Sequence, residues 1–157
     1  MRYTKFLGAL AAIAVLVFQA GLAWAAPESG FWWSPSRSGY GFAIEVQGTT
    51  LFMGTFLYEE NGRSTWYASA GPLQADGSYQ GTMQAYGNGP TLTGPYKPNA
   101  VTNPNAGSIA IRFSDASHAT LTWPGGTIPI ERFVFGSGAS SFKPETGLWW
   151  NTAESGR

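Results

Sequence analysis

The chain has 157 residues, nine basic and nine acidic side chains, one histidine and no cysteine. Its Lys and Arg residues are scattered singly, so it lacks the clustered positive charge by which proteins bind nucleic acid. Without cysteine it has no disulfides, and a chain of this length can bury about two thirds of its unfolded surface, which suffices for one domain.

The first 25 residues have the pattern of a secretory signal. Arg2 and Lys5 precede an almost wholly apolar stretch from Phe6 to Phe18, and Ala23-Trp24-Ala25 is a small-x-small cleavage site. The apolar stretch is shorter than the roughly 20 residues that cross a bilayer. We therefore predict cleavage after Ala25 and a secreted protein, periplasmic or extracellular, with no integral membrane segment in the mature chain.

The mature sequence begins with short alternating runs that are typical of β-strands. Residues 39–47 place Tyr40, Phe42, Ile44 and Val46 on one face, as alternation across a pleat requires. Gly48-Thr49 then leads into residues 51–59. Asn61-Gly62 leads into residues 63–69, and this dipeptide favours a hairpin with a type I′ turn.

The second half of the module continues the pattern after one interruption. Asp76-Gly77 predicts a hairpin between residues 73–75 and 78–86, whereas residues 87–105 contain four prolines and indicate a long surface loop. Further strands are expected at residues 108–114, 119–123 and 128–135. Seven or eight strands joined by hairpins predict an all-β antiparallel meander, barrel-like, with a β-sandwich as the alternative.

The start of the module returns near the end of the chain. Pro27-Glu28-Ser29-Gly30-Phe31-Trp32-Trp33 matches Pro144-Glu145-Thr146-Gly147-Leu148-Trp149-Trp150, and the same offset aligns Ser38-Gly39 with Ser155-Gly156. We therefore expect a first repeat over residues 26–136, a Gly/Ser linker over 137–143 and the truncated start of a second repeat over 144–157.

The inventory of residues that carry chemistry is small. His118 is the only imidazole, and Asp115-Ala116-Ser117-His118 favours a turn over part of a Ser-His-Asp triad. One histidine without cysteine does not provide a zinc site. Glu45 and Glu131 lie in the middle of predicted strands and suit either a carboxylate pair in the barrel interior or ion pairs with Arg112 or Arg132. We expect no catalytic residues, no metal and no cofactor.

Aromatic side chains are the stronger signal. Adjacent residues of a strand face opposite sides, so Trp32 and Trp33 cannot both lie in the core, and the same holds for Trp66 and Tyr67. Residues 51–58 are apolar on both faces, which requires an apolar lumen packed on a loop, a ligand cavity or an interface with a neighbouring repeat. The candidate ligand-binding residues are Trp32, Trp33, Tyr40, Glu45, Tyr58, Trp66 and Tyr67.

Several stretches together form a specific pattern. They are the Gly-x-Trp-Trp-Ser-Pro-x-x-Ser-Gly-x-Gly-Phe-x-Ile-Glu-x-Gln run over residues 30–47, Leu51-Phe52-Met53, Tyr58, Thr65-Trp66-Tyr67 and the run Leu-Thr-Trp-Pro-Gly-Gly-Thr-Ile-Pro-Ile-Glu-Arg-Phe over residues 121–133. The pattern resembles an uncharacterised tandem module of exported bacterial proteins, found alone or beside other extracellular domains. The resemblance implies a repeat and an exported setting, and it implies no catalytic residues.

Three functions are consistent with these features. The first is a non-enzymatic β-module that binds or adheres outside the cell through exposed aromatic rings, with an extracellular ligand as partner. The second is a structural repeat whose aromatic residues pack against the neighbouring copy. The third, with least support, is a hydrolase that uses Glu45 and Glu131.

Overall fold

Eight β-strands make up the regular structure of the residues that the computed structural model describes, 26–136 and 147–153. The predicted signal and linker lie outside these residues. The strands are β1 (Gly30–Trp33), β2 (Gly41–Gln47), β3 (Thr50–Tyr58), β4 (Ser64–Pro72), β5 (Tyr79–Gly87), β6 (Ala100–Phe113), β7 (His118–Trp123) and β8 (Gly126–Arg132).

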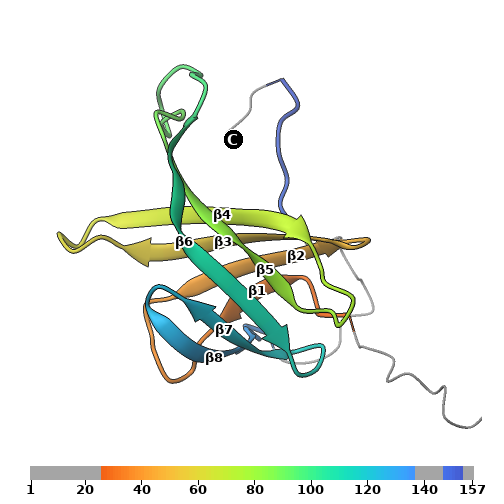
Figure 1. The fold of residues 1–157 in the computed structure, drawn as a ribbon. Coiled ribbons are helices and arrows are strands. Elements are labelled where there is room, and N and C mark those ends of the chain that lie inside the picture. Colours follow the sequence, from red (N-terminus) through yellow and green to blue (C-terminus); the bar gives the residue numbers. More distant parts are fainter. Residues whose placement is uncertain (1–25, 137–146, 154–157) are drawn as a thin grey trace, which may run out of the picture.

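The strands pair in sequence order and close into an antiparallel barrel (Figure 1). Every strand pairs with the next one along the chain, and β1 pairs with β8 to complete the ring. This confirms the all-β, barrel-like meander, and the sandwich alternative is wrong. Closure leaves no long unpaired edge in a sheet that lacks disulfides.

Strict alternation separates the inner and outer faces of the strands. On β2 the side chains of Phe42 and Ile44 are buried in the barrel, and on β3 Leu51 and Met53 are fully buried. Tyr40 and Val46 pack against this core, as their phase with Phe42 predicts. The core also contains Trp32 of β1 and the inward-facing apolar residues of β5 to β8. The latter are Tyr79, Met83, Ile109, Ile111, Phe113, Ala119, Leu121, Trp123, Ile128 and Ile130.

One polar group lies inside this apolar core. The Tyr79 hydroxyl lies 2.7 Å from Ser69 Oγ, and Ser69 Oγ donates to the Thr82 carbonyl at 2.9 Å. Burial raises the pKa of Tyr79, since the phenolate would lose its hydration there. The Tyr79 hydroxyl fits beside Gly81 only because this residue has no side chain, since a Cβ there would overlap the hydroxyl.

The hairpins occur where turn residues predict them, but their turn type is different. Gly62 donates to the Glu59 carbonyl at 2.8 Å and has φ +82°, whereas Asn61 does not have a positive φ. This is a three-residue loop in which a type I turn is followed by a glycine in the left-handed region. The expected type I′ turn is therefore wrong. The Asp76-Gly77 hairpin repeats the same geometry, with Gly77 donating to the Gln74 carbonyl at 2.9 Å.

The predicted loop over residues 87–105 is shorter than expected, because β6 already begins at Ala100. The connection between β5 and β6 projects from the barrel (Figure 1). Pro104 cannot donate to a ladder, and it falls where the β5–β6 register shifts between the Met83↔Gly107 and Ala85↔Asn103 pairs. The irregular pairing accommodates the proline inside a strand that the sequence pattern assigns to a loop.

Candidate functional site

A row of aromatic side chains crosses the outer face of the barrel. Cross-strand partners place Trp33 of β1 opposite Gly41, Gly41 opposite Phe56, and Phe56 opposite Trp66. Tyr86 of β5 extends the row on the far side of Trp66. We call these five residues the outer aromatic row. Gly41 provides no side chain, so the row has a notch between Trp33 and Phe56.

The rings of Trp66 and Tyr86 are stacked. Their centroids lie 5.0 Å apart and their planes differ by 2°, which is an offset-stacked arrangement. Tyr86 is also held by a hydrogen bond from its hydroxyl to Gln84 Oε1 at 2.8 Å. Trp66 nevertheless keeps 43% of its surface exposed. The pair therefore forms a fixed, flat aromatic surface on the outside of the barrel.

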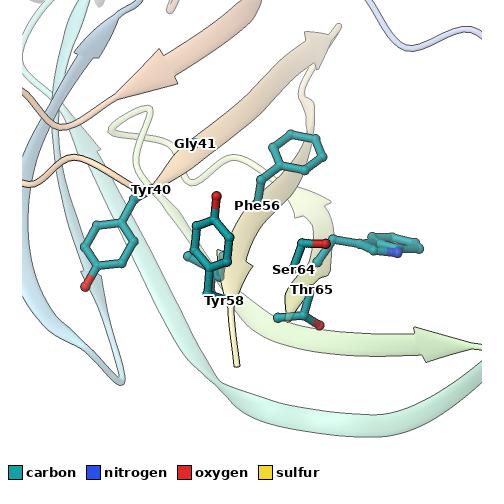
Figure 2. Close-up of a pocket in the computed structure, with 9 residues that line it drawn as sticks. Tyr40, Gly41, Phe56, Tyr58, Ser64 and Thr65 are labelled. Atoms are coloured by element: carbon teal, nitrogen blue, oxygen red, sulfur yellow. The ribbon is translucent and has the colours of Figure 1, made fainter. Parts of the chain in front are cut away.

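A hollow lies beside this surface, along the part of the row formed by β2, β3 and β4 (Figure 2). Its volume is about 430 Å³, and its lining consists of Gly39, Tyr40, Gly41, Phe56, Leu57, Tyr58, Ser64, Thr65 and Trp66. Tyr40 is fixed by an edge-to-face contact with Trp123 of the core at 5.2 Å. Tyr58 and Phe56 expose 66% and 47% of their surfaces.

The lining of the hollow is uncharged and carries hydroxyl groups. Tyr40, Tyr58, Ser64 and Thr65 contribute one hydroxyl each, and none of the nine lining residues is Asp, Glu, Lys, Arg or His. Among the described residues, no hydrogen-bond partner is found for the hydroxyls of Tyr58, Ser64 and Thr65. Apolar rings beside available hydroxyls suit a ligand that has both an apolar face and polar edges.

The structure brings together three of the seven candidate residues from the sequence: Tyr40, Tyr58 and Trp66. Trp33 lies on the same outer row and contacts Phe133 edge-to-face at 5.6 Å. Tyr67 is half-buried and packs against the core. Trp32 is only 1% exposed and contacts Phe113 at 5.7 Å, so its ring does not reach the surface. As expected, only one of Trp32 and Trp33 lies in the core.

Sequence reasoning missed six lining residues of the hollow and Tyr86 beside it: Gly39, Gly41, Phe56, Leu57, Ser64, Thr65 and Tyr86. The alternation in β3 already places Phe56 on the same face as Tyr58, and this signal was available. Gly41 and Tyr86 become part of the site only through cross-strand neighbours.

Glu45 lies at the opposite end of the outer face. Its carboxylate accepts a hydrogen bond from the Leu148 backbone N–H at 2.8 Å, and Gln47 Nε2 donates to its other oxygen. Glu45, Phe52, Leu148 and Trp150 line a second hollow, of about 570 Å³, between β2, β3 and the segment 147–153. The second copy of the repeated sequence therefore covers this end of the face and leaves the hollow at Trp66 open.

The mid-strand carboxylates do not lie in the barrel interior as expected. Glu45 and Glu131 have the opposite phase to Ile44 and Ile130, so both face outward. Strand β1 lies between their strands. Glu131 pairs with Trp33 of β1, which pairs with Gly41 of β2, and Gly41 is four residues from Glu45. Two strand spacings across and four residues along put the Cα atoms of the two glutamates about 16 Å apart. The carboxyl pairs of glycosidases lie within about 5–10 Å of each other.

The arginines pair with other acidic residues than expected. Arg132 Nε lies 3.5 Å from Glu28 Oε2, and Arg132 Nη1 donates to the Phe31 carbonyl at 2.6 Å. Arg112 lies 3.9 Å from Asp76 Oδ2 at the surface. The contacts of Arg132 tie β8 to the chain around β1, and neither arginine pairs with Glu45 or Glu131.

The turn around His118 is a local hydrogen-bonded structure, as its sequence predicts. Asp115 Oδ1 accepts from the backbone N–H groups of Ser117 at 2.7 Å and His118 at 2.8 Å, and Asp115 Oδ2 lies 2.9 Å from His118 Nδ1. The backbone N–H of Ser117, followed by the His118 side chain, lowers the pKa of Asp115 to about 2. The carboxylate thus organises the β6–β7 turn.

Comparison with protein-family models, with curated proteins and with solved structures finds no match for this chain. In the part of the chain that the structure describes, no helix is long and apolar enough to cross a membrane. Within the same residues, no group of three or more His, Cys, Asp or Glu side chains is placed to hold a metal ion.

Proposed function

We propose that this chain is an exported, non-enzymatic β-module that binds an uncharged, sugar-like extracellular ligand in the hollow between Tyr40, Tyr58 and Trp66. The apolar face of a pyranose ring stacks on a flat aromatic surface, and its hydroxyls exchange hydrogen bonds with side-chain hydroxyls at the edge of that surface. The signal-like sequence of residues 1–25 supports export.

The stacked Trp66–Tyr86 pair beside the hollow carries this proposal. Both rings are oriented before any ligand arrives, because Trp66 stacks on Tyr86 and the Tyr86 hydroxyl bonds Gln84. A preformed aromatic surface loses little conformational entropy when it binds. The absence of charge in the lining disfavours an ionic ligand, since a charged group would lose its hydration there without an ionic partner.

A packing role is the second candidate, and one observation favours it. Leu148 of the second copy already bonds Glu45 on the outer face, so at least one end of this face receives a neighbouring segment. If the whole face served that purpose, the hollow would be an interface between modules. The two roles differ in whether the open end binds a small molecule.

A direct binding experiment separates them. The chain is titrated with soluble cello-, chito- and laminari-oligosaccharides and with palmitate, and heat and tryptophan fluorescence are recorded. We expect one oligosaccharide class to bind with a blue shift, and Trp66→Ala to weaken it about tenfold or more, in line with the loss of an aromatic stack. Palmitate as the only ligand would contradict a sugar-like ligand, and no binding by any of the four would favour the packing role.

Two variants serve as matched probes. Gly41→Val fills the notch, and its Cβ would lie 3.7 Å from the Phe56 ring, which is ordinary contact. We expect Gly41→Val to abolish binding while the far-UV spectrum and the unfolding midpoint stay close to those of the parent chain. Phe31→Ala removes an exposed ring of the same face outside the hollow and is expected to leave affinity unchanged.

A further inference from the structure

The barrel closes through its shortest strand. β1 has four residues, and its pairing with β8 comprises only Trp32↔Arg132 and Trp33↔Glu131. By comparison, β1 shares four residue pairs with β2, and β8 shares six with β7. The β1–β8 junction, like that between β4 and β5, therefore comprises only two residue pairs, and here the strand that is held so weakly is also the shortest of the ring.

The strand that lies between β2 and β8 must make several specific contacts. Trp32 completes the core and donates from Nε1 to the Glu28 carbonyl at 3.1 Å. Gly30 has φ +134° and lies against the Arg132 guanidinium, where a Cβ would come within 2.7 Å of Nη2. Glu28 pairs with Arg132, and the Ser29 hydroxyl accepts the Val46 N–H at 3.1 Å.

The second copy of the sequence has suitable residues for each of these contacts. Trp149, Gly147 and Glu145 are identical to their counterparts, and Thr146 retains the hydroxyl of Ser29. Within residues 27–33 the remaining difference is Leu148 in place of Phe31, at an outward position where Phe31 is 50% exposed. Directly after β1, the buried Ser34 corresponds to Asn151. The two copies therefore agree wherever β1 contacts the barrel interior or Arg132.

The second copy also lies close to the strand that it matches. Gly147 and Leu148 line a small cavity together with Gly30, Phe31 and Ala43, outside the barrel wall. The segment is not part of the ring, and its trace, blue in Figure 1, extends away from the barrel strands. It follows β8 in the chain, and residues 133–146 provide ample length for an antiparallel return beside β8.

We propose that the β2–β8 slot is a strand-acceptor site whose second ligand is the segment Gly147–Trp150 of the same chain. In the exchanged form Trp149 replaces Trp32 in the core, Trp150 lies opposite Glu131, and the ring keeps its meander order because the new strand directly follows β8. Each lost contact of β1 is replaced by an equivalent one, so the two forms lie close in free energy. Residues 26–33 become free in the exchanged form.

Disulfide trapping tests the exchange, because the chain has no cysteine of its own. Cysteines are placed at Glu131 and Trp150 in the chain with Trp32→Ala, which weakens the resident strand. Directly opposed residues of an antiparallel pair have Cβ atoms about 4.5–5.5 Å apart, close enough for a bond after small adjustments. We expect an intramolecular disulfide in more than half of the Trp32→Ala chains, and several-fold less when Trp32 is present.

Two controls define the geometry. Glu131→Cys with Trp33→Cys traps the resident β1 and shows that the two positions of the slot can form the bond. Adding Trp149→Ala to the Trp32→Ala trap removes the indole that would take the place of Trp32. The disulfide yield should then fall to the level given by random collisions of an unpaired segment. An unchanged yield in that variant would mean random collision and would overturn the proposal.

Gly30→Val displaces β1 by an independent route, since its branched side chain would clash with the Arg132 guanidinium. The same disulfide should form in that background, and Gly147→Val should suppress it. The proposed exchange would be overturned if neither the Trp32→Ala chain nor the Gly30→Val chain formed the intramolecular disulfide, whether they fold or not. A disulfide found only between chains would also overturn it, because the acceptor site would then take a strand from another molecule.

Discussion

The two faces of β3 have similar apolar composition, yet the barrel uses them differently. Leu51 and Met53 point inward and are fully buried, whereas Phe56 and Tyr58 point outward and remain largely exposed. On the neighbouring strand the same contrast separates the buried Ser69 from Trp66. One strand thus supplies both the core and the candidate site.

This difference shows that aromatic content alone does not identify core residues. Inward side chains are fixed by packing around the Tyr79–Ser69 hydrogen bond, and outward rings are arranged by cross-strand register along the outer aromatic row. Exposed apolar patches on a folded protein commonly mark a binding surface. The two faces should therefore respond to substitution in different ways.

The largest expected effect is on the inner face. Leu51→Ala leaves a cavity in the core and should lower the free energy of unfolding by about 2–5 kcal/mol. Phe56→Ala removes a larger side chain, but one that is 47% exposed, and should cost less than about 1 kcal/mol. Urea denaturation followed by circular dichroism measures both. Equal losses would show that the outer face is as structural as the core.

The glycines of the two faces provide a second, smaller test. Gly81→Ala places a methyl group against the Tyr79 hydroxyl and 2.8 Å from Ser69 Oγ, so it should disrupt the buried hydrogen bond at a cost of about 1–3 kcal/mol. Gly54 lies on the outer face, and a Cβ there would lie 3.9 Å from its nearest neighbour, a Phe52 ring atom. Gly54→Ala should be neutral or slightly stabilising, because it restricts the unfolded chain. The reverse order of unfolding midpoints would contradict the assignment of faces.

Much of the fold could be predicted because alternation has a strong physical cause. A period of two with one apolar face gave the inner residues of β2, and glycine-containing dipeptides gave the positions of the hairpins. The turn type at Asn61 depends on a backbone angle that the dipeptide does not determine. The strand through Pro104 was missed because a local register shift accommodates the proline, and single-sequence patterns do not show such shifts.

The candidate site was harder to predict because it depends on neighbours in space. Gly41 becomes the notch only because Trp33 and Phe56 lie on either side of it in the register. Trp32 was included among the candidate ligand-binding residues because the sequence does not determine which of two adjacent tryptophans points inward. For Glu131, by contrast, the alternation of Ile128 and Ile130 already indicated an outward side chain.

The smallest expected effect lies outside both faces, in the β6–β7 turn. The Asp115 carboxylate has a pKa of about 2 in the folded chain against an ordinary 3.8, so its ionised form stabilises the fold above that ordinary pKa. This contribution is lost as the pH falls through the window between about 4 and about 2. Asp115→Asn removes the charge and keeps one acceptor oxygen, so the variant should unfold at a slightly lower temperature at pH 7.

The difference in melting temperature between parent and Asp115→Asn should shrink as the pH falls from about 4 to about 2 and vanish below that, because protonation makes the two side chains alike in charge. The turn is in water, so the effect should remain below that of Gly81→Ala at every pH. A difference that grows as the pH falls would mean that the ionised carboxylate does not stabilise the turn. In that case the short contacts of Asp115 with Ser117 and His118 would be incidental to the stability of the barrel.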